Sequence, residues 1–304
     1  MKGMIKIFVF CFNFLFLQKD TSSVTYKEYL GVINGYKQLL VDIREYKLSP
    51  QEARERFQDM MLIMKKAHPN ARYDSTQVSI CFPLMGFDFR AVGGYGSGYI
   101  PRGYDLFDQA KKGSHPAHDI FMKDKNQDCR DDRTGDYVPV LSTTDGVVIA
   151  TENGWQPGSE YRGGNYIWIY DTNNGGLWYY AHQREIYVKT GQTVRAGQKI
   201  ALVGRTGFNA AMPRSDTHLH MTYLRIDDEG NPFPVNTYGW LKQATTLLDP
   251  RIAVDLEPIA TVRTIEIQEN IKPLPAIKAP KTTFKFIEPI ADDEPGKSRR
   301  RRRQ

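Results

Sequence analysis

Apolar residues that follow the N-terminal segment recur at the three- and four-residue spacing that predicts a helix. One such stripe consists of Leu30, Ile33, Tyr36, Leu40 and Ile43. A second stripe consists of Ala53, Phe57, Met60 and Met64. Ser49, followed by Pro50 and Glu52, is the capping pattern that begins the second helix, and His68 precedes the proline that ends it. We predict a helical hairpin over residues 23–75, with His68 at its surface.

The period changes from residue 78 onward. Short runs rich in β-branched and aromatic residues alternate there with glycine-rich turns, and they lie at 146–150, 166–170, 177–181 and 199–203. The sequence Asn173-Asn174-Gly175-Gly176 between two aromatic runs predicts a tight hairpin. The pattern predicts a mainly β domain over residues 76–250, built on an antiparallel, barrel-like sheet.

The N-terminal segment has its own pattern. Lys2 and Lys6 precede an apolar run at 7–17 that only Asn13 interrupts. This run is too short to cross a bilayer and is typical of the core of a secretory signal peptide. No small-x-small cleavage site follows it, so residues 1–22 are either a signal peptide or an uncleaved anchor. In both cases we expect export to the periplasm or cell envelope.

The C-terminal residues 251–304 contain six of the 17 prolines and end in an arginine run at 299–303. We predict a disordered tail, because this composition continues neither a helix nor a central strand. These five arginines account for five of the net charge of +6, so the rest of the chain carries a net charge of +1. Nucleic-acid binding is therefore not expected. Peripheral contact of the arginine run with anionic envelope polymers or lipid remains a weaker hypothesis.

Outside the N-terminal segment the chain has two cysteines, Cys81 and Cys129. In an oxidising compartment two such residues either pair or stay free, and the sequence leaves both possibilities open.

Five of the six histidines fall in three short segments: His115-Pro116-Ala117-His118-Asp119, Tyr180-Ala181-His182 and Thr217-His218-Leu219-His220-Met221. In a strand, His218 and His220 point to the same side. A catalytic zinc ion takes three protein ligands and leaves one position to water. His115 and Asp119 can supply two ligands across a bend, and one histidine of the HxH pair can supply the third. Besides His118, two histidines are then left for proton transfer.

This constellation resembles the LytM/lysostaphin-type zinc endopeptidases, metallopeptidase family 23, whose motifs are HxxxD, a single histidine at a strand end, and HxH. The resemblance continues in Val138-Pro139-Val140, in Asp145-Gly146-Val147-Val148 and in the turn-rich run at 191–207. It covers roughly residues 90–250, with the motifs in the family's order.

The resemblance implies that His115, Asp119 and His220 bind one zinc ion, and that His182 and His218 are catalytic residues beside its open position. It implies a zinc peptidase domain at 76–250 that hydrolyses peptide bonds of peptidoglycan, in cross-links or stem peptides, with D,D-type cross-links as our leading choice. His118 departs from the family pattern, and in an extended segment it faces away from Asp119.

Two alternatives belong to other functional classes. One is a non-catalytic relative that binds the cell wall or activates another hydrolase. The other is an envelope adaptor with a structural zinc ion, which a fourth protein ligand such as His118 would close. The sequence does not assign the base to His182 or His218, and it leaves latency and the oligomeric state open.

Overall fold

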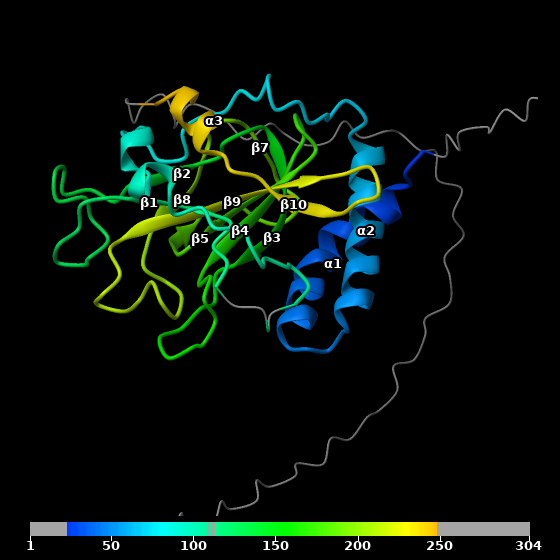
Figure 1. Ribbon diagram of the computed structural model, residues 1–304, viewed down its shortest axis with the longest axis horizontal. Helices are drawn as coiled ribbons and strands as arrows, with labels where there is room; N and C mark the ends of the chain where they lie inside the picture. The colour runs from blue at the N-terminus through cyan, green and yellow to red at the C-terminus, as the bar shows by residue number, and fades with distance from the viewer. Residues whose placement is uncertain (1–22, 109, 111–112, 248–304) are drawn as a thin grey trace, which may run out of the picture. The chain divides into compact units, whose positions relative to one another are not determined.

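The computed structural model describes residues 23–108, 110 and 113–247, all of which fall in one compact unit of the chain, Met1–Val262. Two long helices come first, α1 (Tyr26–Arg44) and α2 (Pro50–Ala67). Each begins with a capping box, Thr25 with Glu28 and Ser49 with Glu52, in which side chains satisfy the free amides of the first turn. The helices lie side by side as the predicted hairpin (Figure 1).

The rest of the described chain is mostly strands. They are β1 (His118–Phe121), β2 (Pro139–Leu141), β3 (Gly146–Glu152), β4 (Tyr166–Asp171), β5 (Leu177–Ala181), β6 (Gln183–Ile186), β7 (Thr193–Val194), β8 (Lys199–Val203), β9 (His218–Ile226) and β10 (Pro232–Pro234). Short helical turns lie at η1 (Phe89–Ala91), η2 (Gly93–Gly96) and α3 (Tyr238–Gln243). The predicted mainly β fold is confirmed.

The strands form two open antiparallel sheets. The large sheet has the order β1-β9-β5-β4-β3-β7, with β10 also paired to β9, and the small sheet has the order β2-β8-β6. The predicted barrel-like sheet is corrected in one respect, because the described strands do not close into a barrel. Immediately after β5 the chain leaves the large sheet and continues as β6, which pairs with β8 instead. Strands β1 and β7 therefore remain the outer strands of the large sheet.

Side-chain alternation along the central strands divides the core into two parts. In β4 all six residues are buried, as expected for a strand covered on both faces. Ile167 and Ile169 belong to the apolar cluster that the small sheet shares, whereas Tyr166, Trp168 and Tyr170 belong to the cluster that includes both long helices. The helical hairpin therefore covers one face of the large sheet, and the small sheet covers the other.

Aromatic contacts attach the hairpin to the sheet. The ring of Tyr36 lies 5.9 Å from that of Trp168 and 6.1 Å from that of Phe57, and Phe57 lies 5.4 Å from Phe107. Tyr36 and Phe57 are completely buried. The hairpin and the sheet thus share one hydrophobic core.

His68 is not the surface residue that the sequence predicts. Its ring lies 6.0 Å from Tyr29 and 5.4 Å from Tyr170, and its Nε2 is buried without a hydrogen-bond partner among the described residues. Burial lowers the pKa of this imidazole. The error arises because the proline marks the end of the helix but not the direction of the side chain.

Cys81 and Cys129 are both buried and both free thiols. Burial raises the pKa of Cys81 to about 11, so the thiol stays protonated at neutral pH. The signal peptide or anchor at 1–22 and the tail at 251–304 lie outside the described residues and stay predictions. Within the described ranges, no helix combines the length and the apolar character needed to cross a bilayer.

Replacing Phe57 with alanine tests whether the hairpin is integral to the fold. The truncation leaves a cavity in the core that the hairpin shares with the sheet, so we expect the free energy of unfolding to fall by about 3–5 kcal/mol in denaturant titrations. The control is Asp59→Ala at an exposed position of the same helix, which should change stability by less than about 0.5 kcal/mol. Equal effects of the two variants would contradict the shared core.

Candidate metal centre

The pairing of β1 with β9 determines which side chains meet. Asp119 stands directly opposite His220, and His118 stands opposite Met221. Opposite residues of an antiparallel pair project to the same face, and neighbours along a strand project to opposite faces. Asp119 and His220 are therefore adjacent on one face, and His118 lies on the other.

His115 reaches the same face from the segment before β1. Its backbone pairs with Ile100 through two hydrogen bonds of 2.7 Å, and its Nδ1 lies 2.8 Å from the carbonyl oxygen of Gly98. These contacts fix the ring so that Nε2 lies 3.4 Å from Oδ2 of Asp119. The predicted bend between His115 and Asp119 is present.

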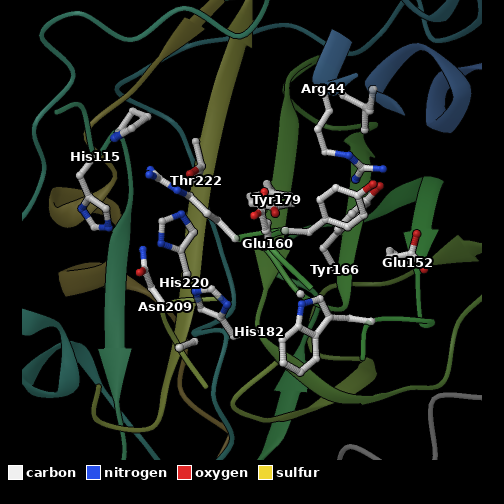
Figure 2. Close-up of a pocket in the computed structure, with 18 of the residues that line it drawn as sticks. Arg44, His115, Glu152, Glu160, Tyr166, Tyr179, His182, Asn209, His220 and Thr222 are labelled. Atoms are coloured by element: carbon white, nitrogen blue, oxygen red, sulfur yellow. The ribbon is translucent and has the colours of Figure 1, made fainter. Parts of the chain in front are cut away.

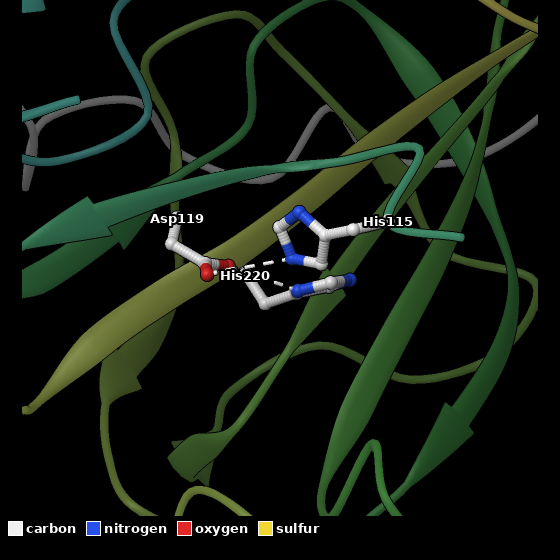
Figure 3. A group of neighbouring side chains, drawn as sticks. All are labelled: His115, Asp119 and His220. Carbon is white, nitrogen blue, oxygen red and sulfur yellow. Dashed lines mark hydrogen bonds and ion pairs between the residues drawn. The ribbon is translucent and has the colours of Figure 1, made fainter. Parts of the chain in front are cut away.

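Figure 3 shows the resulting group of His115, Asp119 and His220. Nδ1 of His220 lies 3.0 Å from Oδ1 of Asp119, and one ligand atom from each of the three residues lies within 4.8 Å of the others. A tetrahedral zinc ion with bonds of about 2.0–2.1 Å holds its donor atoms about 3.3 Å apart. The donor set and its spacing fit zinc. The described part of the chain holds no other group of three such residues.

The electrostatics of the group favour a bound cation. Burial by itself raises the pKa of Asp119, but the hydrogen bonds with His115 and His220 outweigh it and hold the pKa well below its usual range. The hydrogen bond with Asp119 raises the pKa of His115 against the opposing effect of burial. An ionised carboxylate between two imidazoles is the environment that a divalent cation requires.

His182 and His218 lie beside this group. Their ring centroids are 5.0 Å apart, and His182 is 5.6 Å from His220. Nδ1 of His182 lies 2.8 Å from the carbonyl oxygen of Thr206, and Nδ1 of His218 lies 2.7 Å from that of Asp216. Since a carbonyl oxygen only accepts, each Nδ1 carries the proton and donates it, which leaves Nε2 free to accept.

Both rings are neutral at physiological pH. Burial, with the neighbouring histidines, lowers the pKa of His182 to about 3, and burial also lowers the pKa of His218. Neutral imidazoles with an accepting Nε2 are suited to take a proton from a nearby donor.

The backbone holds His182 in an uncommon conformation. Its φ of 66° lies in the left-handed region, at the point where the chain passes from β5 in one sheet to β6 in the other. Thr206 secures this junction, because its hydroxyl donates to the carbonyl oxygen of Gln183 and accepts from the amide of Asn165, both at 2.9 Å. Such strain is typical of functional sites.

Two glycines allow the close backbone approach behind His182. A Cβ on Gly164 would lie 2.3 Å from the carbonyl carbon of Thr206, and one on Gly207 would lie 2.2 Å from the carbonyl oxygen of Arg162. The sequence placed Gly207 in a turn-rich run but did not assign Thr206 or either glycine to the site. Only the pairing of distant segments shows their role.

His118 takes no part in the group. Its Nε2 lies 3.0 Å from Oδ1 of Asn236, its ring lies 5.7 Å from that of Tyr99, and only 2% of its surface is exposed. It faces away from Asp119, as an extended segment predicts. It therefore offers no fourth protein ligand on the side of His115 and His220.

The candidate centre opens into a groove of about 980 Å³ (Figure 2). Its lining includes all five predicted site residues, the C-terminal end of α1 and the aromatic residues of β4 and β5 that face the same side of the sheet. The sequence did not predict the contribution of α1, which includes Arg44. The apolar stripe of a helix shows which face is buried but not what its end borders.

Part of the chain is similar to known proteins. Residues 130–232 match the model of Peptidase family M23. The chain carries a peptidase family M23 domain. The match includes His182 at the β5–β6 junction and both His218 and His220 of β9. His115 and Asp119 lie before its first residue.

Two curated relatives share the domain. The chain is 32% identical to glycyl-glycine endopeptidase ALE-1 of Staphylococcus capitis over 144 residues, which are 47% of this chain and 31% of that protein. It is 32% identical to lysostaphin of Staphylococcus simulans over 151 residues, which are 50% of this chain and 25% of that protein. The matched part thus spans less than a third of the length of either relative.

Solved structures of similar proteins include the catalytic domain of the antimicrobial peptidase lysostaphin from S. simulans. It is 28% identical with a TM-score of 0.32, over 49% of this chain and 90% of that one. A putative glycyl-glycine endopeptidase lytM from Ruminococcus gnavus is 21% identical with a TM-score of 0.39, over 75% of this chain and 90% of that one.

Substituting Gly207 with alanine tests the support of His182. The new Cβ would meet the carbonyl oxygen of Arg162 at 2.2 Å and Nδ1 of His182 at 3.0 Å, at a φ of 107°. We expect a loss of about 1–3 kcal/mol in the free energy of unfolding, measured by denaturant titration.

The matched control is Gly31→Ala. This glycine is exposed within α1, and no atom lies within 4 Å of its added Cβ. In a helix interior alanine is favoured over glycine by roughly 0.5–1 kcal/mol, so the control should stabilise the protein. A Gly207→Ala variant as stable as the parent would show that the close approach behind His182 is not required.

Proposed function

We propose that this protein is an exported zinc metalloendopeptidase that hydrolyses peptide bonds of peptidoglycan. The observation that carries the proposal is the placement of His115, Asp119 and His220 within ligand distance of one another, in a groove that His182 and His218 also line. The arrangement fits an open catalytic site, because three protein ligands leave a position for water or substrate.

His115, through Nε2, Asp119, through its carboxylate, and His220, through Nδ1, would hold the ion. When bound, zinc acts as a Lewis acid toward a carbonyl group and lowers the pKa of a coordinated water to about 7. Asp119 carries one negative charge and the two imidazoles are neutral ligands, so the bound site keeps a net positive charge. That charge favours the oxyanion that develops during amide hydrolysis.

His182 and His218 supply the proton transfers in this proposal. One neutral Nε2 takes the proton of the attacking water. The other ring can donate only after this proton has passed to it, and it then donates a hydrogen bond to the developing oxyanion or gives the proton to the leaving amine. In both rings a backbone carbonyl oxygen holds the proton on Nδ1. The geometry therefore supports either His182 or His218 as the base, with the other ring in the second role.

The resemblance of the motifs to family 23 supports peptidoglycan as the substrate. Its relatives here include a glycyl-glycine endopeptidase, but their matched part is less than a third of their length. We keep the D,D-type cross-link as the expected bond. Export to the periplasm or cell envelope is part of the proposal and is supported by the apolar run within residues 1–22.

Metal analysis of matched variants tests the proposed centre. We expect about one zinc per chain in the parent protein, none in His220→Ala, and about one in His182→Ala and in the control His118→Gln.

Digestion of purified peptidoglycan, followed by mass spectrometry, should show cross-linked muropeptides disappearing with the parent protein. His182→Ala should lower the rate by about 10²–10⁴-fold, the usual contribution of a general acid or base.

Other outcomes would select the rival functions. Zinc-loaded protein that cleaves nothing would favour the non-catalytic, wall-binding or hydrolase-activating relative. Loss of zinc from His118→Gln would favour an adaptor with a closed structural site. Loss of zinc from His182→Ala would contradict the division between ligands and proton-transfer residues.

A further inference from the structure

The groove extends beyond the metal centre along the helix-facing side of the large sheet. Its floor includes Thr222 of β9, Tyr179 of β5 and Trp168 of β4. These three residues stand opposite one another across the ladder, since Thr222 pairs with Tyr179 and Tyr179 pairs with Trp168. At its other side the groove is bordered by Leu40 and Arg44 near the end of α1.

Arg44 is positioned to act on a ligand in this groove. Its guanidinium carbon lies 3.6 Å above the centroid of the Tyr161 ring, which covers one face of the planar group. Its Nε is buried, and the guanidinium has no hydrogen bond or ion pair with any described residue. A guanidinium has five N–H donors, and leaving a buried donor unsatisfied is unfavourable.

Nearby acidic side chains already have other partners. Glu152 lies 3.2 Å from Nζ of Lys37 and also accepts a hydrogen bond of 2.8 Å from the amide of Gly154. Asp105 lies 3.5 Å from the guanidinium of Arg54. Glu160 also lines the groove, but it is exposed and forms no ion pair with Arg44. The positive charge of Arg44 is therefore not offset by a direct contact within the described chain.

The surroundings of Arg44 supply further donors. In Figure 2, Arg44 lies on one side of the groove and the labelled histidines on the other, with Tyr179 and Tyr166 between them. Burial, together with the charge of Glu152, raises the pKa of Tyr166 to about 12, and the charge of Arg44 opposes this rise. A phenol that stays protonated is a hydrogen-bond donor at neutral pH.

We propose that Arg44 forms a carboxylate-binding subsite at the end of the groove away from the metal centre. The fork of a guanidinium matches the two oxygens of a carboxylate, and stacking on Tyr161 holds it ready for that geometry. The protein therefore selects peptides that place a carboxylate on Arg44 while the cleaved bond lies at the metal. This subsite rests on the proposed function, and its ligand is either a terminal or a side-chain carboxylate.

Kinetics with four synthetic peptides test the subsite and distinguish the two sources. The peptides share one cleavable bond and carry an acid or an amide at the C-terminus and, independently, on a side chain. We expect KM for the recognised acid to be at least tenfold lower than for its amide. Arg44→Gln should raise that KM about 10–100-fold with kcat unchanged and should not affect the amide, as expected for loss of a charge-assisted hydrogen bond.

Two further variants separate recognition from net charge and from folding. Arg56→Gln removes an exposed charge of α2 outside the groove and should leave KM unchanged. Arg44→Lys keeps the positive charge but lacks the paired N–H donors of a guanidinium. It should give a KM between those of the parent protein and Arg44→Gln. Two results would overturn the subsite. One is an equal rise in KM for the acid and amide peptides in Arg44→Gln, and the other is an equal KM for acid and amide peptides in the parent protein.

Binding without turnover separates this proposal from the enzymatic one. Muropeptides and their carboxyl-amidated forms are titrated into the full chain by calorimetry. One outcome is that the parent protein binds the acid form preferentially, that Arg44→Gln loses this preference, and that nothing is cleaved. This outcome keeps the subsite and rejects the peptidase. Cleavage without dependence on Arg44 keeps the peptidase and rejects the subsite. Absence of both binding and cleavage rejects both.

Discussion

The pairing register of β1 with β9 is the constraint on which the site depends. It places Asp119 opposite His220, and alternation along the strand places His118 on the other face. A shift of one residue would exchange these faces and would bring His118, instead of Asp119, to the side of His220. Buried side chains on the far face, among them Ile120, Leu219 and Met221, oppose such a shift because it would move them out of the core.

The same sheet face serves two purposes. The helical hairpin covers the part of it near Tyr170, and the groove occupies the part that runs from His220 to Trp168. Because one surface is divided between packing and function, the end of α1 borders the groove. The hairpin is therefore both a structural element that completes the core and, through Arg44, a wall of the candidate site.

The sequence predicted the elements and the site chemistry better than their connection in space. The helix cap at Ser49 and the runs of β-branched and aromatic residues are local signals, and the strand alternation correctly separated His118 from Asp119. The open sheets were not predictable, because the exchange of partner at His182 depends on contacts between segments far apart in the chain. His68 was misplaced for a related reason, since its neighbour Tyr170 belongs to a strand about one hundred residues later.

A crystal structure of the zinc-loaded full chain, phased on the anomalous signal of zinc, tests the central claim most directly. We expect one ion bonded to Nε2 of His115, the carboxylate of Asp119 and Nδ1 of His220, with its remaining position open to the groove beside His182 and His218. An ion closed by a fourth protein side chain, or bound away from these three residues, would contradict the claim that this register builds an open metal centre.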